Sequence, residues 1–456
     1  MTQLDASARN DLEPVESRDD LVRYLASGCK PKSDWRIGTE HEKFGFLRDT
    51  LEPLPFSGPR SIQAVLDGLA DRFGWERLEE NGQLVALKKD GASITLEPGG
   101  QFELSGAPLE HIHQTCNEVH RHLAEVEAVA DPLDVGFIGF GAAPHWSREE
   151  MPRVPKGRYA IMRRYMPTVG GLGLDMMHRT ATVQVNLDFS SEADMIRKFR
   201  ASLALQPIAT ALFANSPLTD GQKNGFRSWR AHVWTDTDPY RTGMLDFVFD
   251  DDFGFDRYTE YMLDVPMYFV WRDGTYLDAT GQSFRDFLEG RLPAAPGQRP
   301  TIEDWKDHLS TAFPEVRMKT FLEMRGADSG SWGKICALPA LWVGLLYDQP
   351  SLDAACELTG DWTREERAEL RRVAARDGMA GRVGRIVVRD VAETMVDLAR
   401  EGLKRRARFD AAGTDETGFL APLEDIVQSG KSFACQLLED FDAGADMRTL
   451  FDRYAY

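Results

Sequence analysis

Two kinds of hydrophobic periodicity alternate along the chain. In residues 108–130, apolar positions recur at steps of three or four, which predicts an amphipathic helix; they are Leu109, Ile112, Cys116, Val119, Leu123 and Val126. A second helix is predicted from Ser191 toward Phe213, because Ser191 and Asp194 have the spacing of an N-terminal capping box. In residues 182–189, Val183, Val185 and Leu187 alternate with polar residues, which predicts a strand with one buried face.

Three further segments alternate in the same way: residues 37–46, 93–105 and 317–325. Strands that are apolar on one face only are typical of antiparallel sheets, because a parallel sheet is covered by helices on both faces. The region from about 360 to 456 is rich in Ala, Leu, Glu and Arg and is predicted to be mainly helical. The expected fold class is therefore α+β, with an antiparallel sheet and surrounding helices.

Composition narrows the possible partners. The 456 residues include 54 Lys and Arg against 73 Asp and Glu, a net charge of −19. Such a surface repels nucleic acid phosphates and anionic lipids, so we expect no nucleic acid and no membrane partner. The longest apolar run, residues 335–346, spans 12 residues and contains Pro339, whereas a membrane-spanning helix needs roughly 18 or more.

The terminal segment and the cysteines bear on the compartment. Residues 1–14 are polar and acidic, without the apolar core of a signal peptide or the arginines of a transit peptide. The five cysteines lie far apart, are odd in number and form no CxxC pair. That pattern argues against a zinc ribbon and against a secreted disulfide scaffold. We therefore expect a cytoplasmic protein.

The polar faces of the predicted strands carry groups suited to metal and phosphate binding. Glu40 and Glu42 share one face of a strand, and a hairpin over residues 93–105 would place Glu97 and Glu103 on one face. Several carboxylates without His or Cys favour Mg²⁺ over zinc. Residues 317–325, read as one strand, place a glutamate beside cations that suit phosphate or carboxylate groups: Arg317, Lys319, Glu323 and Arg325. For any one strand alone, a solvated sheet face is the competing interpretation.

Other motifs are weaker. His41 and Glu42 are not part of an HExxH zinc site, because Gly45 stands where the second His is needed. Gly170, Gly171 and Gly173 lack the spacing of a dinucleotide fingerprint or a P-loop. The basic cluster in residues 156–164 is either an anion site or a solvated helix face. Arg230 has the same two interpretations, an anion-binding residue or a solvated cation. From pattern alone, Cys116 and Cys336 are core thiols.

Long motifs give the chain a family resemblance. GTEHEKFGF (38–46), LEPGGQFELSGAPLEHIHQTCNEV (96–119), PKGRYAIMRRYMPTVG (155–170), RTATVQVNLDFSSEADMIRKFR (179–200), WTDTDPYRTGMLDFVFDD (234–251) and FPEVRMKTFLEMRGAD (313–328) closely resemble the plant-type glutamate–cysteine ligases, a family that includes proteobacterial members. The resemblance implies a curved antiparallel sheet that forms the active-site floor and is surrounded by helices, as in the catalytic core of glutamine synthetases. It also implies that residues 1–456 form a single catalytic unit.

The resemblance further implies the reaction. ATP would phosphorylate the γ-carboxylate of L-glutamate to γ-glutamyl phosphate, and the amine of L-cysteine would displace the phosphate. The product, γ-glutamylcysteine, is the first intermediate of glutathione biosynthesis. Expected ligands are L-glutamate, L-cysteine, ATP and Mg²⁺, and the expected state is a monomer or weak homodimer.

Individual roles are carried over by matching positions. The acidic metal-binding positions correspond to Glu40, Glu42, Glu97, Glu103 and Glu323. Arg325 and Lys319 are expected to stabilise charge on the phosphoryl group, with Arg317, Gln184 and Asn186 near the nucleotide. Arg163, Tyr165 and Arg230 are expected at the amino-acid substrates. Cys116 and Cys336 occupy the positions of one redox-active pair of the plant enzymes, whereas residues 220–320 contain no cysteine to form the second pair.

Two alternatives remain open at this stage. A related carboxylate–amine ligase would use another amine as the acceptor. A non-catalytic or hydrolytic metal protein would bind a divalent ion without ATP, but it would leave the cations of residues 317–325 without a purpose. The ligase chemistry needs both the acidic and the basic strands.

Overall fold

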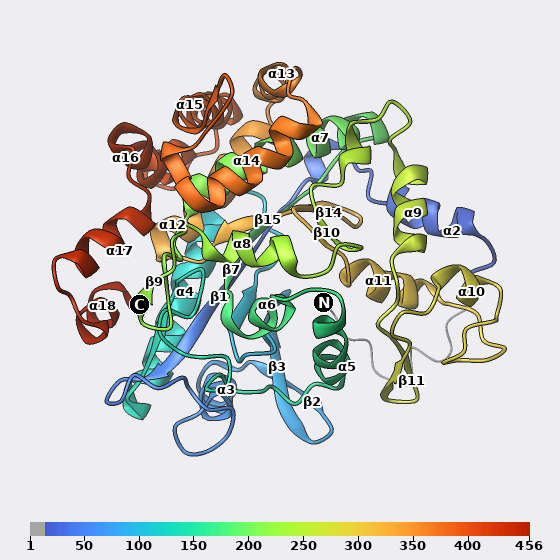
Figure 1. The fold of residues 1–456 in the computed structure, drawn as a ribbon, viewed down its shortest axis with the longest axis horizontal. Helices are drawn as coiled ribbons and strands as arrows, with labels where there is room; N and C mark the ends of the chain where they lie inside the picture. The colour runs from blue at the N-terminus through green and yellow to red at the C-terminus, as the bar shows by residue number, and fades with distance from the viewer. Residues whose placement is uncertain (1–13) are drawn as a thin grey trace.

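The computed structural model describes residues 14–456 and is built on one nine-stranded sheet (Figure 1). The segment 1–13, on which most of the N-terminal expectation falls, lies outside the described residues. The strand order is β14–β15–β7–β1–β5–β4–β3–β2, and β6 pairs with the second half of β1. Every pairing in this sheet is antiparallel, so the predicted α+β class is confirmed. The strands are β1 (Ile37–Leu47), β2 (Glu76–Glu80), β3 (Gln83–Lys89), β4 (Ala92–Leu96), β5 (Phe102–Ser105), β6 (Val135–Ile138), β7 (Thr182–Leu187), β14 (Val316–Met318) and β15 (Leu322–Asp328).

The register of the central strands gathers the polar residues on one face. Glu40 lies opposite Gln184, and Glu42 lies opposite Glu103. Residues directly opposite each other in an antiparallel pair point to the same face. Farther along, Asn186 faces Glu323. The alternation read from the sequence therefore holds across four strands, β5, β1, β7 and β15.

Residues 317–325 form two strands, so the expectation of one continuous strand is wrong. The chain reverses between β14 and β15, where the Lys319 N–H donates to the Phe321 carbonyl oxygen at 2.8 Å. The resulting hairpin places Arg317 opposite Glu323. The polar groups still share a face, but as cross-strand neighbours.

Three long helices pack on the apolar side of the sheet. They are α4 (Ile112–Ala130), α7 (Glu192–Phe213) and α12 (Trp332–Leu346), and they form part of a large hydrophobic core together with Val183, Val185 and Leu187. Ser191 caps α7 as predicted, since its hydroxyl accepts from the Asp194 N–H at 3.2 Å, but the return bond differs from a capping box because Asp194 Oδ2 accepts from the Ser190 N–H at 2.8 Å. Helix α4 starts later than the predicted residue 108, because Leu109 exchanges two backbone hydrogen bonds with Ile37 and is held extended against β1.

Shorter helices frame the polar side: α5 (Gly157–Tyr165), α6 (Gly173–Arg179) and α8 (Trp229–Val233). The C-terminal region contains α13 (Gln349–Thr359), α14 (Arg364–Asp377), α15 (Val388–Arg406), α16 (Ala421–Ser429), α17 (Phe433–Asp442) and α18 (Met447–Tyr454). In Figure 1, α13–α16 lie at the opposite end of the molecule from α3 (Ile62–Phe73) and the β2–β3 hairpin. Helix α15 packs on α12, so the C-terminal helices extend the same core.

The remaining elements lie at the periphery. Helices α2 (Arg18–Ala26), α9 (Phe255–Asp264), α10 (Phe284–Leu288) and α11 (Ile302–Ser310) group beside the β11 (Phe269–Arg272) and β12 (Thr275–Asp278) hairpin (Figure 1). Three short pairs complete the structure: β8 (Leu218–Thr219) with β9 (Gln222–Lys223), β10 (Thr242–Gly243) with β13 (Phe313–Pro314), and β16 (Arg382–Val383) with β17 (Ile386–Val387). Within residues 14–456, none of the helices has the length and apolar character needed to cross a bilayer.

Candidate active site

Four glutamates form an acidic row on the polar face of the sheet. Glu40 and Glu42 come from β1, Glu103 comes from β5, and Glu97 follows β4 at the start of a tight turn. Burial, followed by the charges of Glu97 and Glu103, raises the pKa of Glu42 well above its usual range. Burial and the charge of Glu97 likewise raise the pKa of Glu103, and burial with Glu323 and Glu103 raises that of Glu40. The row therefore carries more negative charge than its surroundings compensate.

A cluster of cations surrounds Glu323 at the other end of the face. Arg317 donates to both carboxylate oxygens, with Nη2 at 2.7 and 2.9 Å. Lys319 Nζ lies 3.1 Å from Oε2, and Arg325 also contacts Oε1. Although burial opposes it, the charge of Arg317, followed by Lys319 and Arg325, holds the pKa of Glu323 well below its usual range. Glu323 is thus an anchor for three cations.

Two amides on β7 connect the acidic row with the cation cluster. Arg325 Nη1 donates to Gln184 Oε1 at 2.6 Å, and Asn186 Nδ2 donates to Glu40 Oε1 at 2.9 Å. Asn186 Oδ1 is buried without a hydrogen-bond partner in the described part of the chain. Gln184 therefore orients the Arg325 guanidinium, and Asn186 orients the Glu40 carboxylate.

Arg230 completes the site from helix α8. Its Nη2 donates to the Arg325 carbonyl oxygen at 2.8 Å, and the residue is 3% exposed. A cavity on the polar face is lined by Arg230 together with Glu42, Glu97, Gln184 and Arg325. The cavity therefore brings one predicted substrate residue together with some of the predicted metal and catalytic residues, whereas Glu40, Glu103, Lys319 and Glu323 do not line it.

The other two predicted substrate residues lie farther out. Arg163 is partly buried on α5, and its Nη1 has no hydrogen-bond partner among residues 14–456, which leaves it available to an anion. Tyr165 packs at 5.2 Å against the Tyr268 ring and beside the buried Arg241, and it does not line the cavity. The expected roles of Arg163 and Tyr165 in binding the amino-acid substrates therefore stay predictions.

Two residues of the basic cluster lie at the site without an assigned role. Tyr159 donates to the Leu96 carbonyl oxygen at 2.7 Å and lies 3.4 Å from Glu97 Oε1. Lys156 donates to the same carbonyl at 3.0 Å, and burial lowers its pKa to about 8. Lys156 and Tyr159 belong to the basic cluster of residues 156–164, and whether that cluster binds an anion stays a prediction.

One wall of the cavity is apolar. It is formed by Met162, Met176, Met177, Trp234 and Phe313. The sequence analysis did not single these residues out, because they come from separate elements: Met162 lies on α5, Met176 and Met177 on α6, Trp234 directly after α8, and Phe313 on β13. A wall of this kind can exclude water from polar chemistry on the sheet floor.

The acidic row is the part of the site that could bind a divalent cation. Among residues 14–456, no three His, Cys, Asp or Glu side chains are already arranged as a metal cage. Burial, followed by the charges of neighbouring carboxylates, raises the pKa values of Glu40, Glu42 and Glu103. The carboxylate oxygens of the acidic row are hard donors of the kind that suits Mg²⁺, which is usually bound by a few carboxylates together with substrate phosphates. The acidic row fits the expected ion, and Glu323 fits it less well because its oxygens are occupied by cations.

Cys116 and Cys336 meet on the far side of the sheet. Cys116 lies on α4 and Cys336 on α12, and both are buried free thiols. Burial, followed by the neighbouring Cys336 sulfur, raises the pKa of Cys116. The two positions implied by the resemblance are therefore adjacent, and their redox role stays a prediction.

Comparison with known proteins identifies the family. The family model for glutamate–cysteine ligase family 2 matches residues 36–450. The chain belongs to this family. It is 57% identical over 430 residues to glutamate–cysteine ligase B, chloroplastic, of Oryza sativa subsp. japonica, which covers 94% of this chain and 85% of the relative. It is 56% identical over 446 residues to the chloroplastic enzyme of Arabidopsis thaliana, covering 97% and 84%. The expectation of a glutamate–cysteine ligase enzyme is confirmed.

A solved structure shares the fold at low sequence identity. A glutamate–cysteine ligase from Francisella tularensis, solved in complex with AMP, superposes with a TM-score of 0.55 at 13% identity. The match covers 91% of this chain and 86% of that one. At this identity the likeness concerns the fold alone, and it agrees with the sheet and helices described above.

The expected cytoplasmic location is contradicted by the relatives. The enzymes from rice, Medicago truncatula and Arabidopsis thaliana are all named as chloroplastic. Compartment is set by targeting signals and not by the catalytic body, so neither the composition nor the cysteine count of this chain could establish it.

Proposed function

We propose that the enzyme joins the γ-carboxylate of L-glutamate to the amine of L-cysteine at the expense of ATP, through γ-glutamyl phosphate, as the first step of glutathione biosynthesis. One observation carries the proposal. The acidic row and the cation cluster lie on one face of the sheet, joined by Gln184 and Asn186. Transfer of a phosphoryl group to a carboxylate brings several negative charges together and needs both kinds of group.

The cations have the clearest task in this mechanism. Arg325 and Lys319 would bind phosphate oxygens and stabilise the charge that develops as the phosphoryl group moves. Arg317 binds Glu323 through both oxygens and is less available to the nucleotide. We therefore assign Arg317 and Glu323 to positioning Arg325 and Lys319, whose side chains both reach Glu323.

The substrate carboxylates need guanidinium partners. Arg230 is buried at the cavity and can bind the α-carboxylate of an amino acid, and Arg163 supplies an unpartnered Nη1 on the same side of the sheet. Gln184 holds Arg325 at one side of the cavity. A fixed guanidinium favours one geometry of the bound carboxylate, which aligns the γ-carboxylate for phosphorylation.

The acidic row is the proposed metal site. Glu40, Glu42, Glu97 and Glu103 would hold Mg²⁺, which when bound supplies positive charge to the triphosphate. Asn186 orients Glu40, and the Thr182 N–H donates to Glu42 Oε2 at 3.0 Å. These contacts of the chain itself hold two of the carboxylates in place, of which Glu42 lines the cavity.

The described surface is consistent with a monomer or weak homodimer, which we also propose. The large hydrophobic residues exposed within residues 14–456 are Tyr240, Trp332 and Phe409, and they lie far apart in the sequence. A stable dimer generally buries a contiguous apolar core. Sedimentation velocity over a range of protein concentrations tests this expectation.

The decisive experiment measures ADP release with Mg²⁺, ATP and L-glutamate, with and without L-cysteine. Cysteine-dependent turnover with γ-glutamylcysteine as the product would establish the reaction. Arg325→Met should lower kcat by at least 100-fold, whereas Arg121→Met on the exposed side of α4 should leave it unchanged. Equal turnover with other amines would replace the acceptor, and the absence of ATP use under every condition would refute the proposal.

A further inference from the structure

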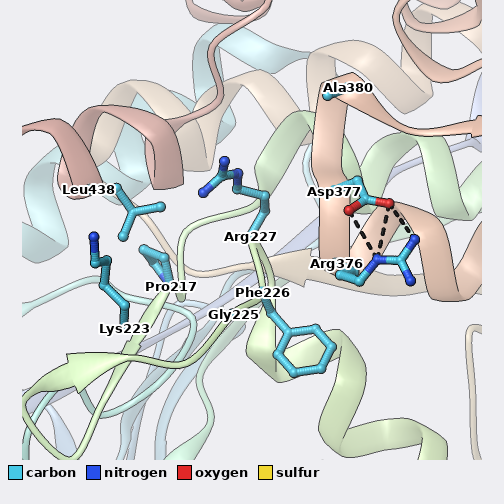
Figure 2. A pocket seen from close by; sticks show the side chains of 9 residues that line it. All are labelled: Pro217, Lys223, Gly225, Phe226, Arg227, Arg376, Asp377, Ala380 and Leu438. Carbon is cyan, nitrogen blue, oxygen red and sulfur yellow. Dashed lines mark hydrogen bonds and ion pairs between the residues drawn. The ribbon is translucent and has the colours of Figure 1, made fainter.

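A second cavity of about 410 Å³ lies outside the active site. It is formed where the β8–β9 hairpin and the segment after it meet the end of α14 and helix α17 (Figure 2). Its lining shares no residue with the cavity on the sheet floor. A volume of this size is within the range of small-molecule sites in proteins.

Three cations line this cavity in a chain of strongly negative net charge. They are Lys223, Arg227 and Arg376. Lys223 Nζ pairs with Asp442 at 2.5 Å, and Arg376 binds the neighbouring Asp377 through Nε and Nη2. Arg227 differs from both, because its guanidinium has no hydrogen bond or ion pair to any described residue. Figure 2 shows Arg227 between Lys223 on one side and Arg376 on the other.

The backbone of Arg227 is held firmly although its side chain is unpaired. Its N–H donates to the Ala375 carbonyl oxygen at 2.9 Å, and its carbonyl oxygen accepts from the Ser216 N–H at 3.2 Å. At the end of α14, Gly378 has a φ of +57°, and a Cβ there would lie 3.1 Å from Arg227 Cγ. The positive φ favours glycine, and the close approach shows that the Arg227 side chain packs against the end of α14.

We propose that this cavity binds a small organic anion through a phosphate or carboxylate group, with Arg227 as its principal contact. A guanidinium without a protein partner can donate two parallel hydrogen bonds to such a group. Lys223 and Arg376 add positive potential from the two sides, although each is partly neutralised by its aspartate. Pro217 and Leu438 offer apolar surface to the rest of the molecule.

The site lies close to a support of the active site. Arg227 is followed by Ser228, whose hydroxyl donates to Asp328 at 2.7 Å, and Arg230 begins the next turn. An anion bound at Arg227 would therefore contact the segment that leads into α8. The binding site itself is inferred from the cavity and does not depend on the ligase reaction.

Isothermal titration calorimetry of the full chain in EDTA tests the proposal, with inorganic pyrophosphate in one series and succinate in another. We expect at least one probe to bind with a stoichiometry near one, and we expect Arg227→Met to weaken that binding at least tenfold. The probe that binds distinguishes a phosphate from a carboxylate ligand. Methionine keeps the length of the side chain and its packing against the end of α14, and thermal unfolding checks that the variant is folded.

Three further variants sharpen the outcome. Arg227→Lys should retain part of the affinity because it keeps the charge, and Arg325→Met should retain all of it because Arg325 lines the other cavity. Arg121→Met changes the same net charge on the exposed surface of α4 and should have no effect. Binding of neither probe, binding that survives Arg227→Met, or equal loss in Arg227→Met and Arg121→Met would overturn the proposal.

Discussion

Arg317 and Glu323 form a buried, two-oxygen ion pair across the β14–β15 hairpin. Arg317 Nη2 reaches both carboxylate oxygens at 2.7 and 2.9 Å, Nε reaches Oε2 at 3.1 Å, and Glu323 is 0% exposed. Lys319 and Arg325 share the same carboxylate. Because one anion holds three cations in place, the geometry of the phosphate-binding residues depends on Glu323.

Replacing Glu323 should affect both stability and activity. Glu323→Gln leaves buried Arg317 without its counter-ion, and removing one partner of a buried ion pair costs about 3–5 kcal/mol. We expect a clearly lower midpoint in urea unfolding and a large loss of ligase activity. Glu79→Gln, an exposed change on β2, serves as the control and should alter neither quantity. Equal midpoints for the two variants would show that Glu323 does not anchor the cluster.

Replacing Glu42 should have the opposite effect on stability. Its pKa is raised by burial and by Glu97 and Glu103, so the folded protein binds this proton more tightly than the unfolded chain does. The stabilisation is complete below the ordinary glutamate pKa of 4.5 and is lost as the pH rises through the higher folded value. In EDTA at neutral pH, Glu42→Gln should therefore raise the melting temperature.

The same variant separates a metal site from a solvated acidic face. We expect Mg²⁺ to raise the melting temperature of the wild-type protein and to have a much smaller effect on Glu42→Gln, because the site loses a charged ligand. Scanning fluorimetry over a range of Mg²⁺ concentrations measures both shifts. Identical Mg²⁺ responses in the two proteins would argue against a cation at the acidic row.

The polar face was predictable from sequence because strand geometry alone decides it. Side chains alternate with a period of two, so Gln184 and Asn186 must share a face wherever β7 is placed. The antiparallel register then keeps such faces together, as with Glu42 opposite Glu103. The residue pattern of a single strand is therefore sufficient to predict which of its side chains share a face of the sheet.

Contacts between segments were not predictable in the same way. The sequence placed Glu323 beside cations on one strand, but only the hairpin brings it opposite Arg317, which binds both of its oxygens. Leu109 continued the helical periodicity of α4 but is held extended by Ile37. In both cases a partner distant in sequence or a chain reversal overrides the local pattern.

Asp328 should act as a positioning residue for Arg230. Its Oδ2 accepts from Ser216 Oγ at 2.7 Å, and Ser216 Oγ in turn accepts from the Arg230 N–H at 3.2 Å. Hydrogen bonds to charged groups contribute about 1.5–3 kcal/mol, so Asp328→Asn should raise KM for glutamate about tenfold or more. We expect a smaller change in kcat and an intact fold by circular dichroism.

A graded control accompanies this substitution. Ser216→Ala removes one hydrogen bond of the same chain but keeps the carboxylate and should change KM for glutamate less than Asp328→Asn does. KM for ATP should be unaffected in both variants, because Arg230 is assigned to the amino acid. A loss of kcat alone, with KM for glutamate unchanged, would exclude the positioning role.

The five thiols should divide into two classes. Cys116 and Cys336 are buried, and burial together with the adjacent sulfur raises the pKa of Cys116, whereas Cys29, Cys356 and Cys435 are partly exposed. Because the thiolate is the reactive form, alkylation of the native protein at pH 8 should be slow at the buried pair. Mass spectrometry should find up to three labels in native protein and five after unfolding.

Oxidation tests the relation between the buried thiols. If the adjacent pair forms a disulfide, oxidised protein should lose two labelling sites after unfolding, and Cys116→Ser should abolish that loss. Cys435→Ser, at a partly exposed position on α17, is the matched control. Five labels in oxidised, unfolded protein would exclude the redox pair.

Lys334 should make stability depend on pH in the alkaline range. The residue is 9% exposed on α12, its Nζ lies 3.6 Å from the centre of the Phe433 ring, and burial lowers its pKa from 10.5 to about 7. Between these two values the unfolded chain holds the proton and the folded protein does not, so the free energy of unfolding should rise with pH across that window. Lys334→Met removes this contribution.

Urea unfolding at several pH values between 7 and 10 should give a shallower rise in the free energy of unfolding for Lys334→Met than for the wild-type protein. Other buried lysines, such as Lys198 with a pKa lowered to about 8, contribute to both curves and cancel in the comparison. Parallel curves would show that Lys334 keeps its proton in the folded protein.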